Sequence, residues 1–220
     1  MKNKTEKDQQ ALTIKILLVP VLIIIAQLPT MFLTSKFKEP YWKTILVIIV
    51  SALVISFFIW ILQKVQRFIT KKLNAQAWLM IIIATSFIVI INKILLPFFQ
   101  TTGNANVKAQ LRVLHSTPVL FIIYALVVAP VIEELLFRGY LINVLFSHTS
   151  HRSVLISHTN YLGMVCSAAI FGLLHISTDP IYFFSKFILG ILLGIVYEKT
   201  KNIKASIIVH LLNNWLALII

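Results

Sequence analysis

Long apolar runs are the feature that most limits how this chain can fold. Seven of them divide the 220 residues, and each is close to the length that crosses a lipid bilayer as a helix. Because a backbone inside a bilayer must satisfy its own hydrogen bonds, the sequence predicts an all-α, polytopic membrane helix bundle of about seven transmembrane helices. The runs lie at about Leu12–Leu33, Lys43–Leu62, Ala77–Phe99, Pro118–Phe146, Tyr161–Ile176, Ile181–Tyr197 and Ala205–Ile220.

Composition points the same way. Hydrophobic residues make up 59% of the chain and charged residues only 12%, which is typical of a membrane protein and leaves no separate soluble domain. The net charge of +13 therefore has no folded surface on which to bind nucleic acid. We expect one integral membrane domain over residues 1–220, surrounded by the lipid bilayer, with a polar cytosolic tail over residues 1–10. Cys166 is the only cysteine, which excludes an intramolecular disulfide and a cysteine metal cluster.

The first apolar run could be mistaken for a signal peptide. It is too long for the apolar part of a signal peptide and lacks a small-residue cleavage site, so we expect a retained helix. Pro20 and Pro29 should kink it or end it locally.

The polar interval Gln100–Thr117 carries apolar residues at helical spacing beside basic ones. It is either a short basic helix on the membrane surface or an ordinary solvated loop.

The basic residues indicate the orientation. With seven crossings, twelve lysines and arginines fall on the N-terminal side and five on the opposite side. Because cytoplasmic loops carry an excess of Lys and Arg, we expect a multi-pass protein with its N-terminus in the cytosol. A short, basic chain with a single cysteine is typical of a bacterial protein, so the bacterial cell membrane is the expected location.

Three charged residues stand inside the run Pro118–Phe146. A charge at the centre of a membrane helix costs about 2.5–3.5 kcal/mol on insertion scales, so such residues usually serve a function. Glu134 and Arg138 are four residues apart and can pair on one helix face. Glu133 is rotated by about 100° from Glu134 and has no basic residue one turn later. It could act as a general base, or all three could form a structural clamp between helices.

Two further polar sites lie in apolar runs. His175 ends one of them, and His210 and Asn214 share a face inside the last. A lone membrane histidine usually packs through hydrogen bonds, but together with Glu133 these residues can activate a water and stabilise an oxyanion. His148 and His151 lack the spacing of metal ligands and are expected to be exposed loop residues. The G-x-x-x-G of Gly190 and Gly194 indicates close helix packing inside the bundle, and it is weak evidence for a homodimer.

At these motifs the chain resembles the CAAX-protease and bacteriocin-processing family of intramembrane endopeptidases, also called the abortive-infection family. That family carries E-E-x-x-x-R, F-x-x-x-H and H-x-x-x-N in this order. Here the three motifs are Glu133–Arg138, Phe171–His175 and His210–Asn214. The resemblance covers about Pro118–Ile220, which would be the catalytic core. It implies a membrane protease that hydrolyses peptide bonds at or within the membrane.

The resemblance also implies roles for single residues. Glu133 would be the base, with His175 helping to position or activate the water. His210 and Asn214 would form the oxyanion hole, and Glu134 and Arg138 would be the supporting pair. We expect a metal-free mechanism without a cofactor. The alternative is a zinc enzyme with Glu133, His175 and His210 as the three ligands.

Some alternatives stay open at this point. His175 is expected near the outer end of its helix, whereas Glu133 and His210 lie deeper. Either that helix starts later than Tyr161, or residues Ser177–Pro180 dip into the bundle. The substrate would be a membrane-embedded or membrane-associated peptide or protein, and the bacterial role would be peptide or bacteriocin processing or self-immunity. A non-catalytic immunity or scaffold protein is the second hypothesis, and a proton-coupled transporter with a Glu–Arg gate is the third.

Overall fold

The computed structural model describes residues 2–33, 41–66, 68–98, 105–145, 156–175 and 179–218. Within these ranges every regular element is a helix. Five helical spans are long and apolar enough to cross a membrane, namely Gln10–Met31, Trp42–Val65, Ala75–Phe98, Pro118–Ile142 and Pro180–Thr200. The runs predicted as the fifth and seventh crossings form shorter helices. The fold is therefore the predicted polytopic bundle, and the protein is an integral membrane protein.

Prolines divide the N-terminal span, as the sequence predicts. Helix α1 (Lys2–Leu17) is followed by α2 (Val19–Ala26) and α3 (Leu28–Met31), and each of the two short helices has a proline in its first turn. Proline is tolerated there because the first helical N–H groups have no intrahelical partner. Residues 2–10, expected as a polar tail, are helical and belong to α1.

The next helices match the second and third runs with small extensions. Helix α4 (Tyr41–Val65) is continuous, and α5 (Ala75–Leu95) ends in the 3₁₀ turn η1 (Leu96–Phe98). The Asn74 side chain accepts a hydrogen bond of 2.9 Å from the Ala77 N–H, which caps α5 and places its start. The polar interval contains helix α6 (Ala105–Ser116), so the helical alternative for that interval is right and the loop is wrong.

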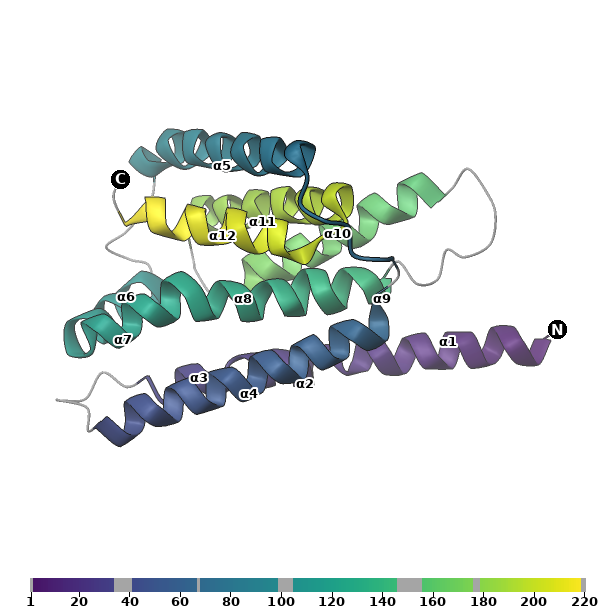
Figure 1. The fold of residues 1–220 in the computed structure, drawn as a ribbon, viewed down its shortest axis with the longest axis horizontal. Coiled ribbons are helices and arrows are strands. Elements are labelled where there is room, and N and C mark those ends of the chain that lie inside the picture. Colours follow the sequence, from purple (N-terminus) through teal and green to yellow (C-terminus); the bar gives the residue numbers. More distant parts are fainter. Residues whose placement is uncertain are drawn as a thin grey trace.

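The fourth run is a single long rod of mixed helix type (Figure 1). Helix α7 (Pro118–Ile123) leads into η2 (Tyr124–Val128), α8 (Ala129–Glu134), η3 (Leu135–Ile142) and α9 (Asn143–Leu145). Both η2 and η3 are π-helical. π-Helical segments are rare in proteins, and those that do occur are often found at functional sites. They flank the two glutamates at the end of α8.

Three helices form the C-terminal part: α10 (Ile156–Leu174), α11 (Pro180–Thr200) and α12 (Ile203–Ala217). A Cβ added to Gly190 would lie 2.9 Å from the Ala168 Cβ of α10, and one added to Gly194 would lie 2.6 Å from the Met164 Cγ. The G-x-x-x-G motif therefore allows α10 to approach α11 inside the bundle, which confirms the internal role predicted for it.

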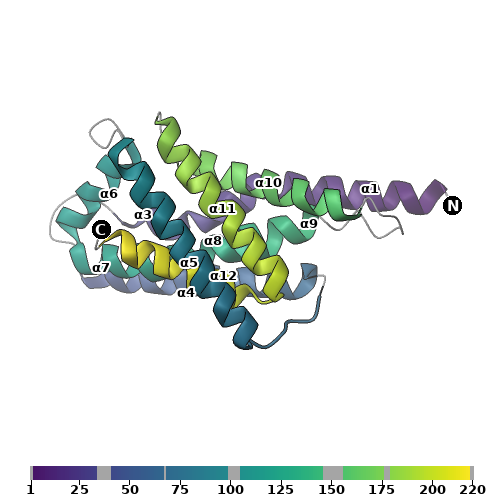
Figure 2. The ribbon, with the colours of Figure 1, turned by 90° about the horizontal axis from the view of Figure 1, so that it is seen from above.

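The rod that carries the glutamates is central. It packs between α4 on one side and α12 on the other, and α5 crosses α11 and α12 on the far side of the bundle (Figures 1 and 2). Phe58, Leu136, Phe171 and Leu193 are among the most buried core side chains. Outward faces carry large apolar residues such as Leu53, Ile82 and Leu162, which are about two-thirds exposed and suit contact with lipid.

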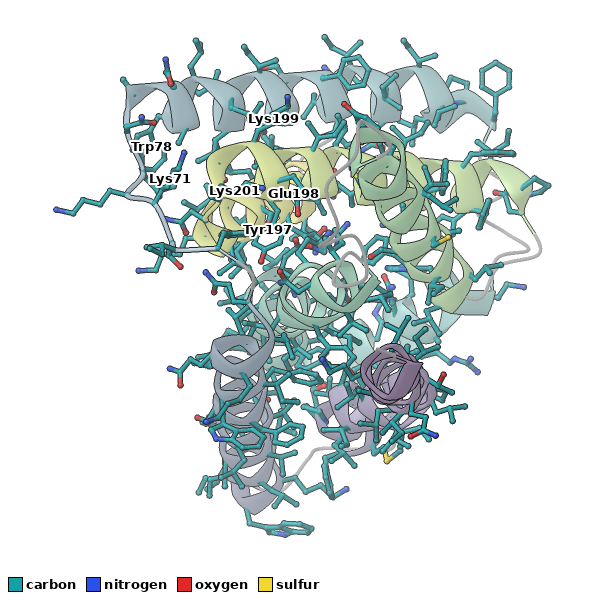
Figure 3. All side chains as sticks on the ribbon, turned by 90° about the vertical axis from the view of Figure 1, so that its right-hand side faces the viewer. Lys71, Trp78, Tyr197, Glu198, Lys199 and Lys201 are labelled. Atoms are coloured by element: carbon teal, nitrogen blue, oxygen red, sulfur yellow. The ribbon has the colours of Figure 1, made fainter. Side chains whose placement is uncertain are left out.

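One end of the bundle is tied together by two links. The Asn202 side chain donates a hydrogen bond of 2.7 Å to the Lys71 carbonyl, and the Lys71 N–H donates one of 3.2 Å to the Lys201 carbonyl. The segment before α5 therefore lies beside the α11–α12 link. Figure 3 shows Lys71, Lys199 and Lys201 at this end.

Candidate active site

The two adjacent glutamates have different surroundings. The Glu134 side chain has no exposed surface, whereas 26% of the Glu133 side chain is exposed. Because α8 is helical, the two carboxylates point about 100° apart, so one turns into the core and the other toward accessible space. Only Glu133 could meet a water or a substrate.

Glu134 is held by Arg138. The Arg138 Nη1 lies 2.8 Å from the Glu134 Oε1, and both side chains are fully buried. The Arg138 Nη2 donates a further hydrogen bond of 2.7 Å to the Gly190 carbonyl of α11, and its guanidinium lies 5.1 Å from the centre of the Phe171 ring of α10. The pair that the spacing permits is therefore present, and it also fastens the central rod to two other helices.

His210 of α12 bridges the two glutamates. Its Nδ1 lies 3.0 Å from the Glu134 Oε1, and its Nε2 lies 3.6 Å from the Glu133 Oε2. A carboxylate paired with arginine accepts hydrogen bonds, so Nδ1 donates to Glu134 and Nε2 faces Glu133. Glu133, which has no partner on its own helix, thus has one from α12. Spacing along the sequence indicates only that His210 shares a face with Asn214.

Phe171 joins His175 to this cluster. Its ring centre lies 4.7 Å from that of His175 and 5.8 Å from that of His210. His175 follows the last residue of α10, and its Nδ1 lies 2.8 Å from the Phe171 carbonyl oxygen. Helix α10 begins at Ile156, which is earlier than the predicted start at Tyr161. The first explanation offered for the depth of His175, a helix that starts later than Tyr161, is therefore wrong. Residues 176–178 lie outside the described part.

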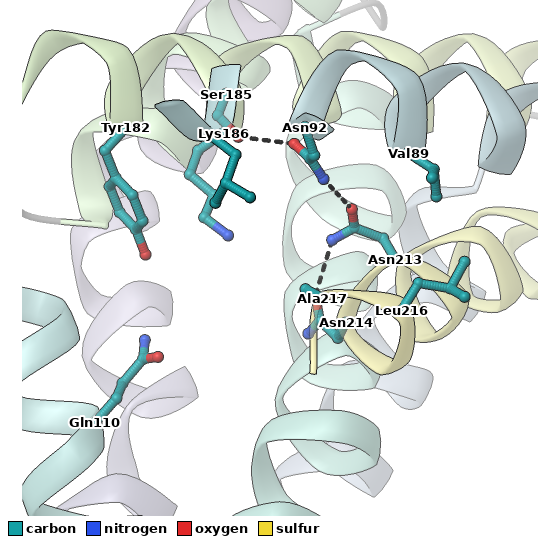
Figure 4. A pocket seen from close by; sticks show the side chains of 11 residues that line it. Val89, Asn92, Gln110, Tyr182, Ser185, Lys186, Asn213, Asn214, Leu216 and Ala217 are labelled. Carbon is teal, nitrogen blue, oxygen red and sulfur yellow. Dashed lines mark hydrogen bonds between the residues drawn. The ribbon is translucent and has the colours of Figure 1, made fainter. Parts of the chain in front are cut away.

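Asn214 stands at the end of a row of polar side chains (Figure 4). Its Nδ2 donates a hydrogen bond of 3.1 Å to the Ala125 carbonyl in η2, and its Oδ1 accepts one of 3.0 Å from Asn213. Asn213 in turn accepts one of 3.0 Å from Asn92, which accepts one of 3.1 Å from Ser185. Sequence reasoning missed Asn92, Ser185 and Asn213 as site residues. The two asparagines carry one signal, which is that amides are rare inside apolar helices, and Ser185 carries none.

A cavity of about 300 Å³ borders this row. The Lys186 ammonium reaches into it and lies 5.3 Å from the centre of the Tyr182 ring. Of the four predicted catalytic residues, Asn214 lines the cavity. The remaining lining residues are Val89, Asn92, Leu96, Gln110, Tyr182, Ser185, Lys186, Asn213, Leu216 and Ala217.

The zinc alternative requires Glu133, His175 and His210 to converge on one point. Among the residues that the structure describes, no group of three or more His, Cys, Asp or Glu side chains is placed to hold a metal ion. Glu133, His175 and His210 are not gathered into such a group in the described part of the chain. His148 and His151 lie outside the described residues.

Comparison with known proteins agrees with these motifs. Residues 115–216 match the model of the family "Type II CAAX prenyl endopeptidase Rce1-like", a segment that contains every candidate residue from Glu133 to Asn214. Over 109 residues the chain is 28% identical to the Bacillus subtilis (strain 168) protein named "Putative membrane peptidase YdiL". This alignment covers 50% of the present chain and 40% of that relative. No solved structure matches the chain. Residues 115–216 are thus similar to the Rce1-like family.

Proposed function

We propose that this protein is an intramembrane endopeptidase that hydrolyses peptide bonds at or within the membrane, with a water activated by Glu133. The family supports a CAAX-protease-like membrane peptidase. The single observation that carries the finer proposal is the contact of His210 with two glutamates, of which one is fully buried and the other partly exposed. Two carboxylates of unlike environment are suited to unlike roles.

The first step is attack by water. Glu133 takes a proton from a water held with His175, and the hydroxide adds to the peptide carbonyl carbon. The His210 Nε2 lies 3.6 Å from Glu133, so the proton can be shared with the imidazole. The imidazolium then donates from Nε2 to the oxyanion while Nδ1 stays on Glu134. When the tetrahedral intermediate collapses, His210 returns the proton to Glu133, and Glu133 delivers it to the leaving amine.

Asn214 is the second donor in this proposal. Its amide nitrogen carries two hydrogens, and one of them goes to the Ala125 carbonyl. The other is left for the oxyanion, one helical turn from His210. Fixed donors aimed at the developing charge are among the strongest sources of catalysis, because they need no reorganisation during the reaction.

The substrate in this account is a membrane-embedded or membrane-associated peptide or protein. We place the protein in a bacterial cell membrane with its N-terminus in the cytosol, since the basic residues favour that side. Processing of peptides or bacteriocins, or self-immunity, would be its role. The cavity beside Asn214 could receive the part of the substrate next to the cleaved bond.

The test uses full-length protein purified into liposomes. Wild type should cleave membrane peptides at defined bonds, read by mass spectrometry. His175→Ala and His210→Ala should abolish cleavage while both variants still insert into the membrane at the wild-type level. Cys166→Ser, which changes an exposed residue outside the cluster, is the matched control and should cleave normally. Full activity in both histidine variants would favour the non-catalytic scaffold.

A second arm of the test removes metal. Because Glu133, His175 and His210 do not form a metal-binding group here, cleavage should survive strong chelators and dialysis, and elemental analysis should find no stoichiometric zinc. Loss of activity on stripping, with recovery on adding zinc, would overturn the metal-free mechanism and leave the peptidase proposal standing.

A further inference from the structure

We infer that Asn92 of α5 is a positioning residue for Asn214, acting through Asn213. The inference rests on the proposed function, in which Asn214 donates to the oxyanion. Asn92 is distant in the sequence and lies outside the segment that matches the family, residues 115–216. Helix α5 would therefore complete a site whose motifs all lie on other helices.

The hydrogen bonds form one continuous row with one direction. The Ser185 hydroxyl donates to the Asn92 Oδ1 at 3.1 Å, and the Asn92 Nδ2 donates to the Asn213 Oδ1 at 3.0 Å. The row continues from the Asn213 Nδ2 to the Asn214 Oδ1 at 3.0 Å, and from the Asn214 Nδ2 to the Ala125 carbonyl at 3.1 Å. Every amide presents its oxygen to the preceding donor and its nitrogen to the following acceptor. Figure 4 shows the part of the row from Ser185 to Asn214.

This direction determines which atom Asn214 can offer. Its oxygen is occupied by the Asn213 amide, so its nitrogen must face η2 and the proposed oxyanion position. If Asn214 turned over, its oxygen would face the Ala125 carbonyl, and two acceptors would meet. The same conflict would pass along the row to Asn92, because each amide fixes the next. Hydrogen bonds in such a row also polarise one another in the same sense.

Burial makes the row costly to disturb. Asn213 and Ser185 are buried, with 4% and 7% of their surface exposed, so an amide that loses its partner here loses a hydrogen bond of the protein interior. Asn92 of α5 forms hydrogen bonds with two other helices, with Asn213 of α12 and with Ser185 of α11. It holds the Asn213 amide in place, and Asn213 holds Asn214.

The experiment measures kcat and KM for a cleaved peptide, using the full chain in liposomes. Asn92→Ala should lower kcat by on the order of 10- to 100-fold, the loss expected when a catalytic group is misplaced by about 1 Å, with KM close to wild type. Asn92→Asp should lose at least as much, since a carboxylate only accepts and would force the Asn213 amide to turn. Ser185→Ala, at the far end of the row, should lose less.

The matched control is Thr85→Val, two helical turns earlier on α5. The Thr85 hydroxyl is buried and has no hydrogen-bond partner among the described residues, so its removal should change neither kcat nor KM. An Asn92→Ala protein with normal kcat and raised KM would overturn the inference, because it would make Asn92 a substrate contact on the cavity wall.

A double variant separates this inference from the proposed function. In an Asn214→Ala background, Asn92→Ala should cause no further loss of kcat. The decrease in melting temperature of the double variant should be smaller than the sum of the decreases in the two single variants. Additive losses would overturn the inference while the peptidase stands. If wild type cleaves no peptide, the proposed function fails together with the positioning role, and the melting temperatures then decide whether the row couples α5 to α12.

Discussion

At the residue scale, the site depends on two neighbouring carboxylates that share one histidine. The spacing of Glu134 and Arg138 predicts their ion pair, and the pair forms at 2.8 Å. The same reasoning leaves Glu133 without a partner on its own helix, which is right, but it cannot find His210 opposite. Contacts between helices depend on how the helices rotate and pack, and spacing along one helix does not encode that.

Arg138 serves two acceptors, and this gives a testable contrast. Arg138→Ala removes the cation that neutralises the buried Glu134 and leaves that carboxylate with the His210 Nδ1 alone. Breaking such a buried pair costs about 3–5 kcal/mol, so the melting temperature should fall strongly. Arg138→Lys should recover only part of that loss, because one ammonium cannot reach both Glu134 and the Gly190 carbonyl as the guanidinium fork does. Thermal melting in detergent measures both. Equal melting of Arg138→Ala and wild type would contradict the clamp.

At the element scale, some features follow from sequence and others do not. Pro20 and Pro29 predict the breaks in the first span because proline acts locally. The π-helical segments η2 and η3 carry no comparable local signal. They change which carbonyls are available around the glutamates, and the Ala125 carbonyl that accepts from Asn214 lies in η2.

The two glycines of α11 should respond differently to substitution. In Gly190→Ala the new Cβ would lie 3.0 Å from the Cα of Ala168, a backbone atom that cannot move alone. In Gly194→Ala it would meet the flexible Met164 side chain, which can turn away. Gly190→Ala should therefore destabilise by about 1–3 kcal/mol and Gly194→Ala by less, as measured by thermal melting. The reverse order would show that α10 and α11 are not packed as described.

At the scale of the whole molecule, hydropathy predicts the bundle, but the family motifs cover only its C-terminal half. The N-terminal helices carry no motif, yet α4 packs on the rod of the glutamates and α5 supplies Asn92. The contribution of α5 could not be foreseen, since one asparagine in an apolar run gives no indication of its partner. In Figure 1 the start of α1 and the end of α12 lie at opposite ends of the bundle.

The orientation can be tested by cysteine labelling. In a Cys166→Ser background, Lys4→Cys and Lys71→Cys should both react with a membrane-impermeant reagent only after the cells are permeabilised, because both positions belong to the basic side. Lys108→Cys is the contrasting position and should react in intact cells. Labelling of Lys4→Cys in intact cells would contradict a cytosolic N-terminus.

The most direct test of the central claim is the turnover number of Glu133→Gln. The substitution keeps the size of the side chain and its place beside His210, but an amide cannot accept the proton of the attacking water. For purified protein in liposomes at saturating peptide, kcat should fall by about 10²–10⁴-fold, with an unchanged melting temperature. A Glu133→Gln protein that cleaves the same bond at the wild-type rate would contradict Glu133 as the base.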